Sequence, residues 1–331
     1  MGRPRSPLGV LNSPAMPTVA EVAPLLRAEV AKAVAGQDAV VEACLVALLA
    51  NGHVLLEGVP GVAKTLLVRS LAAALALEYT RIQFTPDLMP SDVLGTRVYD
   101  PRALDFELRK GPIFTSILLA DEINRTPPKT QSSLLEAMEE RRVTLDGEPH
   151  PLPTPFVVFA TQNPLDFEGT YPLPEAQQDR FLLKVIVDYP REAEERDVLR
   201  RHDAGFRPQA LEAAGVRSVV SAGDLDALRA EVAAQTVDEK VIDYILAIVR
   251  ATREVEDLRA GASPRAGIAL LNGAKALSAL RGRSFVIPDD VKELAYPALR
   301  HRVILRPEAE VEGLTVDAVL KEIVDRVPVP R

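Results

Sequence analysis

Lys64 and Thr65 are the side chains with the clearest potential for chemistry, because they follow a glycine loop that joins a strand pattern to a helix pattern. The stretch HVLLEGVPGVAKTL begins with apolar residues that predict a short buried strand, and Gly58 then opens a loop that ends at the lysine. The next residues, TLLVRSLAAALALE, carry apolar side chains at helical spacing and contain no Gly or Pro. This order of elements is typical of a phosphate-binding site.

Such a loop can hold a nucleotide mainly through its backbone. Its N–H groups can surround phosphate oxygens, and the N-terminus of the following helix favours negative charge. Lys64 would meet the outer phosphates as a point charge, and the Thr65 hydroxyl would ligate Mg²⁺. The other residues expected to contact the nucleotide are Gly58, Val59, Pro60, Gly61, Val62, Ala63 and Leu66.

One position departs from the general pattern G-x-x-x-x-G-K-[ST], because Ala63 precedes the lysine where the pattern has glycine. A Cβ atom disfavours a positive φ, so we expect Ala63 to adopt helix-like dihedrals. Taken alone, the stretch is also compatible with an ordinary Gly-Pro turn between a strand and a helix.

Two further apolar segments end in polar residues that suit the same chemistry. SILLA runs into Asp121 and Glu122, and FVVFA runs into Thr161, Gln162 and Asn163. Ligands of open parallel sheets bind outside the carboxyl ends of the strands, so the strand ends are expected to converge. Asp121 would hold Mg²⁺ through its water shell, Glu122 would deprotonate the attacking water, and Asn163 would position that water beside the γ-phosphate. The alternative is a helix cap at the acidic pair and a turn at the asparagine.

Composition limits the class of protein. The chain has 331 residues and a net charge of −8, which does not favour nucleic acid as a bulk partner. Its single cysteine, Cys44, lies among apolar residues and is expected to be a small core residue in a reducing compartment. No apolar run approaches the roughly 20 residues that span a membrane. We therefore expect a cytoplasmic protein without a membrane span.

The strand and helix patterns divide the chain. Residues 1–17, rich in Pro and Gly, are expected to be a disordered leader. Patterns alternate over 18–190, which predicts an α/β domain with a parallel sheet and helices on both faces. Only helical patterns follow, so 191–220 is expected to connect to an all-helical domain at 221–331.

Two further segments are expected to have roles of their own. The turn AVAGQD lies just upstream of the phosphate loop, so Gly36 and Gln37 are expected to contact the nucleotide, with Gln37 near the adenine. An ordinary helix-helix turn is equally compatible with this segment. The long stretch 87–110 is punctuated by Pro and Gly and is expected to be an insertion that carries a hairpin.

Taken together, these motifs resemble those of MoxR-type AAA+ ATPases over about residues 18–306. The matching stretches are GHVLLEGVPGVAKT, FTPDLMPSDVLGT, KGPIF, LLADEINRTPPKTQSSLLEAMEER, FATQNP, LPEAQQDRFLLK, GASPRA and PDDVKELAYPALRHR. The alanine before the lysine is itself usual in this family, whereas Gln178 replaces a more usual apolar residue. The resemblance implies a P-loop parallel-sheet AAA+ core, a smaller helical lid domain, and ATP with Mg²⁺ as ligands.

The resemblance also assigns roles to two arginines. Arg180, in QDRF, matches the arginine finger that reaches the nucleotide of a neighbouring subunit, and Arg265, in SPR, matches the second sensor of the lid. The chemistry agrees, because a γ-phosphate transition state needs positive charge beyond Lys64 and the metal. The residues alone also allow Arg180 to pair locally with Asp179 or Glu175, and Arg265 to be a surface charge at a helix start. Whether Arg265 serves its own subunit or a neighbour's stays open.

At the level of function, the resemblance implies a homo-oligomer, a hexameric ring, that remodels a protein client. Such a chaperone-like ATPase would assemble, mature or activate protein complexes or metalloenzymes, with a von Willebrand factor A domain protein as partner. The alternatives are a nucleotide-gated binding scaffold with slow hydrolysis, a magnesium-chelatase-like motor and a nucleic-acid motor of the same branch. Acidic residues dilute the basic ones in 87–110 and 141–150, which does not favour the nucleic-acid motor.

Overall fold

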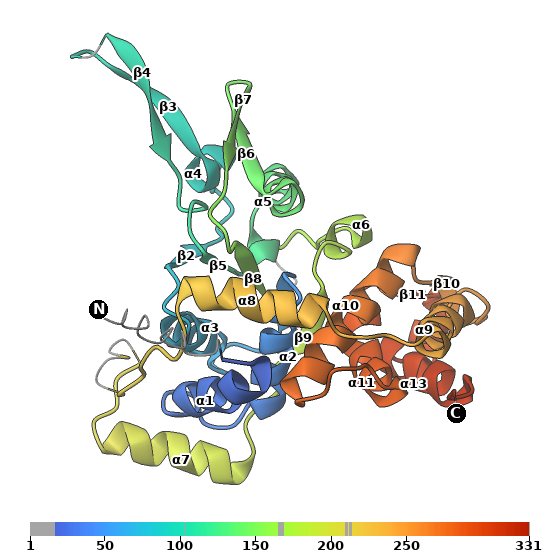
Figure 1. The fold of residues 1–331 in the computed structure, drawn as a ribbon. Helices are drawn as coiled ribbons and strands as arrows, with labels where there is room; N and C mark the ends of the chain where they lie inside the picture. Colours follow the sequence, from blue (N-terminus) through green and yellow to red (C-terminus); the bar gives the residue numbers. More distant parts are fainter. Residues whose placement is uncertain (1–16, 103, 165–168, 209–210, 212–213, 331) are drawn as a thin grey trace, which may run out of the picture.

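A five-stranded parallel sheet forms the centre of the computed structural model, which describes residues 17–102, 104–164, 169–208, 211 and 214–330 (Figure 1). The order of its strands is β2-β5-β8-β1-β9, and every neighbouring pair is parallel. The strands are β1 (Val54–Glu57), β2 (Tyr79–Gln83), β5 (Ile117–Asp121), β8 (Val157–Gln162) and β9 (Leu183–Ile186). Apart from Pro17, the expected disordered leader lies outside the described residues.

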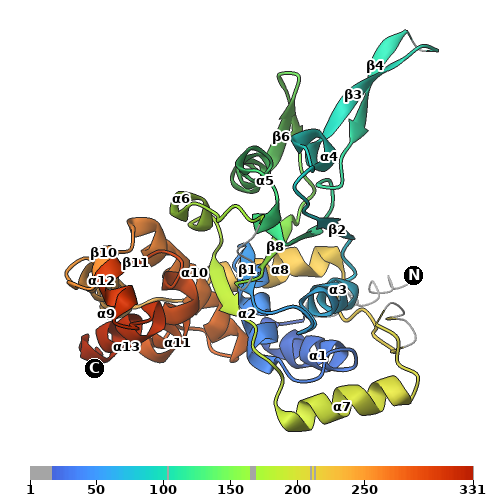
Figure 2. The same ribbon diagram turned by 180° about the vertical axis from the view of Figure 1, so that it is seen from behind.

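Helices cover both faces of this sheet, as predicted (Figures 1 and 2). Alternate strand residues enter different cores, because successive side chains of a strand point to opposite faces. In β1, Val54 and Leu56 pack in one core while Leu55 packs in the other, and all three are fully buried. The first core contains residues of α1 (Val19–Ala31), α2 (Asp38–Leu49) and α3 (Lys64–Ala74), and the second contains residues of α4 (Pro90–Leu94) and α5 (Pro128–Glu140).

The start of α1 shows how local sequence sets an element boundary. The Thr18 side chain accepts a hydrogen bond from the backbone N–H of Glu21, and the Glu21 carboxylate accepts one from the backbone N–H of Thr18. This capping box satisfies two N–H groups that the helix itself leaves unpaired. The helix therefore begins where the sequence pattern places it.

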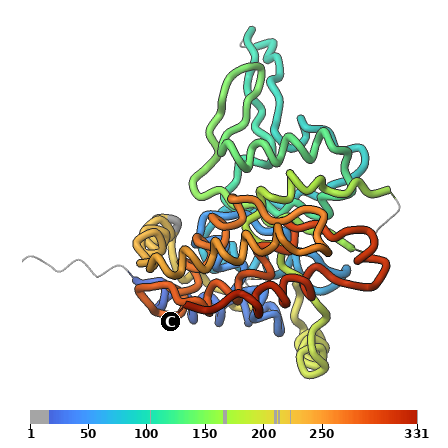
Figure 3. Tube along the Cα trace, turned by 90° about the vertical axis from the view of Figure 1, so that its right-hand side faces the viewer, coloured from blue at the N-terminus to red at the C-terminus, as the bar shows by residue number. Residues whose placement is uncertain are grey.

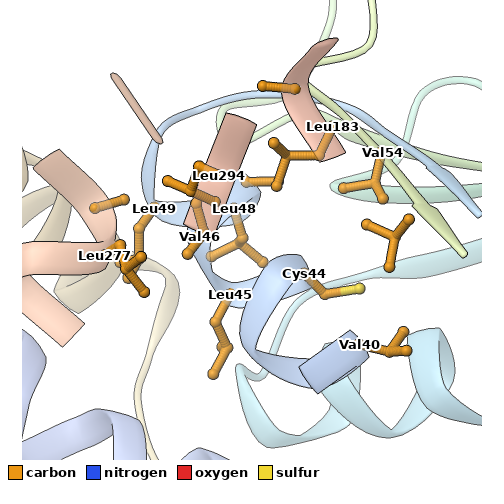
Figure 4. Packing of buried hydrophobic residues seen from close by; sticks show 14 of the residues in the cluster. Val40, Cys44, Leu45, Val46, Leu48, Leu49, Val54, Leu183, Leu277 and Leu294 are labelled. Atoms are coloured by element: carbon orange, nitrogen blue, oxygen red, sulfur yellow. The ribbon is translucent and has the colours of Figure 1, made fainter. Parts of the chain in front are cut away.

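Helices dominate the C-terminal part of the chain, and they pack directly on the sheet domain. Leu294 lies beside Val46 and Leu48 of α2, and Leu277 lies beside Leu49, in the same core as the buried Cys44 (Figure 4). The expectation that Cys44 is a core residue is confirmed. The helices are α8 (Ala222–Ala233), α9 (Glu239–Ala251), α10 (Pro264–Leu280), α11 (Pro288–Leu299), α12 (Pro307–Val311) and α13 (Val316–Arg326). None of the helices found within the described ranges is both long and apolar enough to cross a membrane.

The expectation of an all-helical second domain is wrong in one detail. The segment before α10 and the segment after α11 form a short antiparallel ribbon, β10 (Leu258–Ala260) and β11 (Ile304–Leu305). The two segments pair because the helices bring them side by side, a contact that neither segment reveals by its own pattern.

Two hairpins and the helix α7 (Glu192–Asp203) project from this body (Figures 1 and 3). The insertion forms the predicted hairpin, β3 (Gly95–Asp100) with β4 (Asp105–Lys110), and a second hairpin joins β6 (Arg142–Leu145) to β7 (Glu148–Pro151). A short helix, α6 (Glu175–Gln178), precedes β9, and α7 (Glu192–Asp203) follows it. No residue of α7 is fully buried, and its exposed apolar residues take part in the cavity described below.

Candidate nucleotide site

The phosphate loop runs from the end of β1 to the start of α3, and Lys64 is the first residue of that helix. The backbone N–H of Gly58 donates to the carbonyl of Gln162, 3.2 Å away, which ties the loop to the end of β8. A Cβ atom on Gly58 would lie 2.3 Å from the carbonyl oxygen of Val187. This position therefore requires glycine because backbone passes too close for a side chain.

The prediction of helix-like dihedrals for Ala63 is wrong. Its φ is 63° and its ψ is 21°, which is the left-handed region, and Gly61 two residues earlier has a φ of 87°. Ala63 caps α3, so the chain must turn there from the loop into the helix axis. An alanine in this region costs about 1 kcal/mol or more relative to glycine, and this strain lies within the phosphate loop itself.

The Lys64 ammonium group lies over this loop. It donates to the carbonyl oxygen of Gly58 and, at 3.3 Å, to that of Val59. Thr65, the second residue of α3, lines the same cavity as Lys64. The two side chains are thus positioned by a helix N-terminus, where backbone N–H groups and the helix dipole both favour an anion.

Asp121 and Glu122 follow β5 at the carboxyl edge of the sheet. Asp121 is 8% exposed, and its two carboxylate oxygens have different partners. Oδ1 accepts from the Thr161 hydroxyl at 2.6 Å, whereas Oδ2 accepts from Nε and Nη2 of Arg81 at 2.9 and 2.6 Å. The carboxylate is thereby fixed and held next to a positive charge.

Glu122 adopts left-handed dihedrals, with φ 57° and ψ 50°, which turns its side chain out of the strand direction. Its backbone N–H donates to the Thr161 hydroxyl at 2.8 Å. Its Oε2 accepts from the Gln83 amide at 2.8 Å and from Arg125 at 3.1 Å. A non-glycine residue in this region at a site of potential catalysis is a typical place for stored backbone strain.

A cavity of about 1080 Å³ connects these groups. The convergence predicted from three strand ends is present, since Lys64, Asp121, Glu122 and Asn163 all line this cavity, and Asn163 is 7% exposed. The other predicted residues that line it are Gln37, Pro60, Gly61, Val62, Ala63, Thr65 and Leu66. Three of the residues that were expected to contact the nucleotide, Gly36, Gly58 and Val59, do not line the cavity.

Apolar side chains from several segments also line the cavity. They include Val34 near the end of α1, Tyr189 after β9, and Val198 and Leu199 of α7. The Gln37 side chain donates to the carbonyl of Asp188 at 2.8 Å, which links the turn before α2 to the segment after β9. An apolar wall of this kind suits a flat heterocycle attached to a phosphate chain.

Arg180 and Arg265 do not line this cavity. They lie in a separate pocket of about 260 Å³, which shares no lining residue with the first. Both pair with Glu139 at the end of α5: Arg180 with Oε2 at 3.0 Å and Arg265 with Oε1 at 2.6 Å. Arg180 is therefore not paired with Asp179 or Glu175, the partners that sequence alone allowed. We call Glu139, Arg180 and Arg265 the arginine cluster.

A third arginine fixes the backbone that carries Arg180. The Arg302 side chain is 3% exposed and forms an ion pair with Asp179 at 2.6 Å. It also donates to the backbone carbonyls of Asp179, Phe181 and Leu182 at 3.0, 2.7 and 3.1 Å. A residue that follows α11 thus holds the segment on both sides of Arg180.

Two family models match the chain. One, described as the ATPase family associated with various cellular activities (AAA), matches residues 53–183, and the other, the AAA lid domain, matches residues 250–323. The chain is 45% identical to Chaperone MoxR1 of Mycobacterium tuberculosis over 94% of this chain and 84% of that protein. This chain belongs to the MoxR-type family of AAA ATPases. It is also 31% identical to Protein MoxR of Methylorubrum extorquens, over 91% of this chain and 93% of that protein.

Two further relatives cover almost the same range as this MoxR-type chain. The uncharacterized protein YeaC of Bacillus subtilis is 50% identical over 86% of this chain and 88% of that protein. A crystal structure of a provisionally assigned ATPase from Cytophaga hutchinsonii matches with a TM-score of 0.86 and 42% identity, over 95% of this chain and 96% of that chain. The expected AAA core followed by a helical lid is confirmed.

The donor groups of this MoxR-type site fit magnesium better than a metal that needs several protein ligands. The described ranges of the chain contain no group of three or more His, Cys, Asp or Glu side chains that could hold a metal ion. Mg²⁺ keeps several waters and uses one or two protein oxygens together with substrate phosphates. The Thr65 hydroxyl and the Asp121 carboxylate supply such oxygens in one cavity. Oδ1 of Asp121 accepts one hydrogen bond, from Thr161, and retains a further lone pair for a bound water.

Sequence reasoning missed four residues that organise these sites. Arg81 and Gln83 bind the acidic pair, and their spacing on β2 would have revealed them only if the β2–β5 pairing were known. Glu139 lies beside Glu140 and two arginines in the sequence, a pattern that is typical of a solvated helix end and not of a binding group. Arg302 gave no signal beyond its presence in a matched stretch. Contacts between distant segments, which sequence spacing does not encode, position all four.

Proposed function

We propose that this chain hydrolyses ATP in the presence of Mg²⁺ and uses the energy to remodel a protein client as a chaperone-like ring. Membership of the MoxR-type family supports the ATPase activity, and a relative at 45% identity is named Chaperone MoxR1. One observation carries the rest of the proposal. The groups suited to binding and hydrolysis line one cavity, while the two arginines suited to transition-state charge lie outside it.

The phosphate loop and Lys64 bind the phosphate chain in this proposal. The backbone N–H groups of the loop and the N-terminus of α3 surround the phosphate oxygens, and the Lys64 ammonium exchanges the Gly58 carbonyl for the outer phosphates. The apolar wall on α7 and the turn that contains Gln37 take the adenine. Thr65 and Asp121 would hold Mg²⁺, which neutralises the charge that develops on the phosphates.

Glu122 is the general base in this proposal, and Asn163 positions the attacking water. Gln83 holds Oε2 of Glu122 at 2.8 Å, which fixes the carboxylate that must accept the proton. The Thr161 hydroxyl accepts from the backbone N–H of Glu122 and donates to Asp121, so one side chain aligns both acids. A general base must first lie within reach of the proton that it accepts, and the contacts of Glu122 hold it in one position.

Arg180 and Arg265 would act on the nucleotide of another copy of the chain. Each pairs with Glu139 in a pocket that shares no lining residue with the phosphate-loop cavity of its own chain. A surface that completes a different surface of the next copy is heterologous, and such contacts form a closed ring where the rotation between copies closes. We propose a ring in which both arginines contribute between subunits, and its hexameric size follows from the family resemblance.

The cellular role follows from the family rather than from the site. We propose that the ring assembles, matures or activates protein complexes or metalloenzymes, together with a von Willebrand factor A domain partner. The buried free Cys44 is consistent with a reducing compartment, and we place the protein in the cytoplasm.

The test is the ATPase rate per protomer across protein concentration, for the wild type, Glu122→Gln and Arg180→Ala. A rate per protomer that rises with concentration and is lost in both variants supports a site completed between subunits. A rate that is flat with concentration and insensitive to Arg180→Ala would show a self-sufficient site in each chain. That outcome would replace the ring motor with a nucleotide-gated switch.

A further inference from the structure

Glu139 occupies an unusual place, because one carboxylate binds two arginines from different parts of the chain. Oε1 contacts Arg265 of α10 at 2.6 Å, and Oε2 contacts Arg180, which precedes β9, at 3.0 Å. The side chains of the arginines are 28% and 49% exposed, so both remain accessible at the rim of the pocket. Without a carboxylate between them, two adjacent guanidinium groups would repel each other.

The backbone beneath Glu139 is itself held in place. The buried His53 ring accepts from the backbone N–H of Val158 at 3.0 Å through Nδ1, so its Nε2 carries the proton donated to the carbonyl of Met138 at 3.3 Å. Arg141, in the left-handed region at the end of α5, donates to the carbonyls of Asn51 and Phe156. The carboxylate therefore projects from a fixed helix end.

We infer that Glu139 is a positioning residue, which holds Arg180 and Arg265 as one unit against the terminal phosphates of a neighbouring copy's nucleotide. The inference rests on the proposed function, in which both arginines act between subunits. It adds that the lid arginine and the finger arginine are presented together, because the same carboxylate sets both. Each guanidinium has five N–H donors, so binding Glu139 leaves donors for a phosphate.

The adjacent Glu140 provides a matched comparison. It pairs with Arg142 at 3.0 Å, and the two side chains are 49% and 53% exposed. An exposed ion pair of this kind contributes little to stability. Glu140 pairs with Arg142, whereas the two arginines of the cluster pair with Glu139. Glu139→Gln and Glu140→Gln remove the same charge from neighbouring positions, so their difference isolates the role of the cluster.

The experiment measures kcat, KM and ATP affinity of the full-length chain for Glu139→Gln, Glu140→Gln and Arg180→Ala. We expect Glu139→Gln to lower kcat about tenfold with unchanged affinity for ATP, because its own cavity is intact and only the aim of the arginines is lost. Glu140→Gln should match the wild type. Equal kcat values for Glu139→Gln and Glu140→Gln would overturn the inference.

Mixing separates positioning from a general structural defect. Glu122→Gln protomers keep their arginines but lack the base, so they can complete the site of a Glu139→Gln neighbour. In an equimolar mixture, about half of the Glu139→Gln sites should regain the rate of the wild type, as in a mixture of Arg180→Ala with Glu122→Gln. If only the Arg180→Ala mixture recovers, Glu139 damages its own subunit and the inference is wrong. If Arg180→Ala alone loses no activity, the proposed function fails.

Discussion

The phosphate-loop cavity and the arginine cluster are both charged sites, but the chain builds them differently. The cavity lies at the carboxyl edge of one sheet, where β1, β5 and β8 end side by side. The arginine cluster joins the end of α5, the segment before β9 and the start of α10, and Arg302 anchors it from beyond α11. The first is a property of sheet topology, whereas the second depends on how the lid packs on the core.

This difference separates nucleotide binding from the completion of the catalytic site by a neighbouring copy. The cavity contains the side chains that the proposal assigns to nucleotide binding and to water activation, whereas the two arginines pair with Glu139 in a separate pocket. Changes in the cavity should therefore affect nucleotide affinity, and changes in the cluster should affect turnover. Substitutions in each site and a change of pH distinguish the two, beginning with the strongest contrast.

The largest contrast is between Lys64→Ala and Arg180→Ala. We expect Lys64→Ala to weaken ATP binding by roughly 10- to 100-fold, since it removes charge-assisted hydrogen bonds to phosphate. Arg180→Ala should leave ATP affinity unchanged and lower kcat by about 10³-fold, the order of effect of an arginine finger. Fluorescent nucleotide titration and steady-state kinetics measure the two quantities. A loss of affinity in Arg180→Ala would contradict the separation.

Arg302→Met should reduce stability. It should also lower kcat, because Arg302 holds the backbone on both sides of Arg180. It removes the partner of Asp179 and leaves a partly buried carboxylate unpaired, so we expect the free energy of unfolding to fall by about 3 kcal/mol. Chemical denaturation measures this loss, with the exposed Arg326→Met as the control. Nucleotide affinity at a temperature where the variant is folded should stay at the level of the wild type, because Arg302 does not line the cavity.

Acid should lower the stability of the folded chain, because two buried histidines contact the backbone next to the arginine cluster. Burial lowers the pKa of His53 to about 3, and burial lowers the pKa of His301 well below its usual value. His301 approaches the carbonyl of Phe181 at 3.0 Å, next to Arg180. The unfolded chain binds these protons near pH 6.5 while the folded chain does not, so stability is complete above that pH and is lost below it.

For His53 alone the loss at pH 5 is about 2 kcal/mol. Urea denaturation at pH 7 and pH 5 measures it, with His53→Gln as the comparison. That variant should be less stable at pH 7 but should lose less stability between the two pH values. An identical pH dependence in the variant would mean that His53 does not resist protonation in the folded chain.

Ala63→Gly should have the smallest effect. Glycine adopts a φ of 63° without a Cβ penalty, and this gain exceeds the extra entropy of the unfolded chain by about 0.5 kcal/mol. We expect a slightly higher melting temperature and unchanged ATP affinity. A lower melting temperature would show that the alanine side chain contributes packing that the backbone strain conceals.

Much of the nucleotide site could be predicted from the sequence. The convergence of Lys64, Asp121, Glu122 and Asn163 on one cavity could be predicted, because each follows a strand pattern and parallel strands bring their ends to one edge. The dihedrals of Ala63 could not be predicted from its Cβ atom alone. The direction of the turn into α3 overrides the local preference there.

Local sequence is sufficient for most elements of the sheet domain: the apolar period predicts the strands of the parallel sheet, the spacing of glycine and lysine predicts the phosphate loop, and Thr18 with Glu21 caps a helix start. The tertiary structure alone decided which charges meet. Glu139 reads as a solvated helix end, yet it lies between Arg180 and Arg265, which are separated from it by 41 and 126 positions. Charges act over a few ångströms through space, and only packing of the lid on the core brings these three within that range.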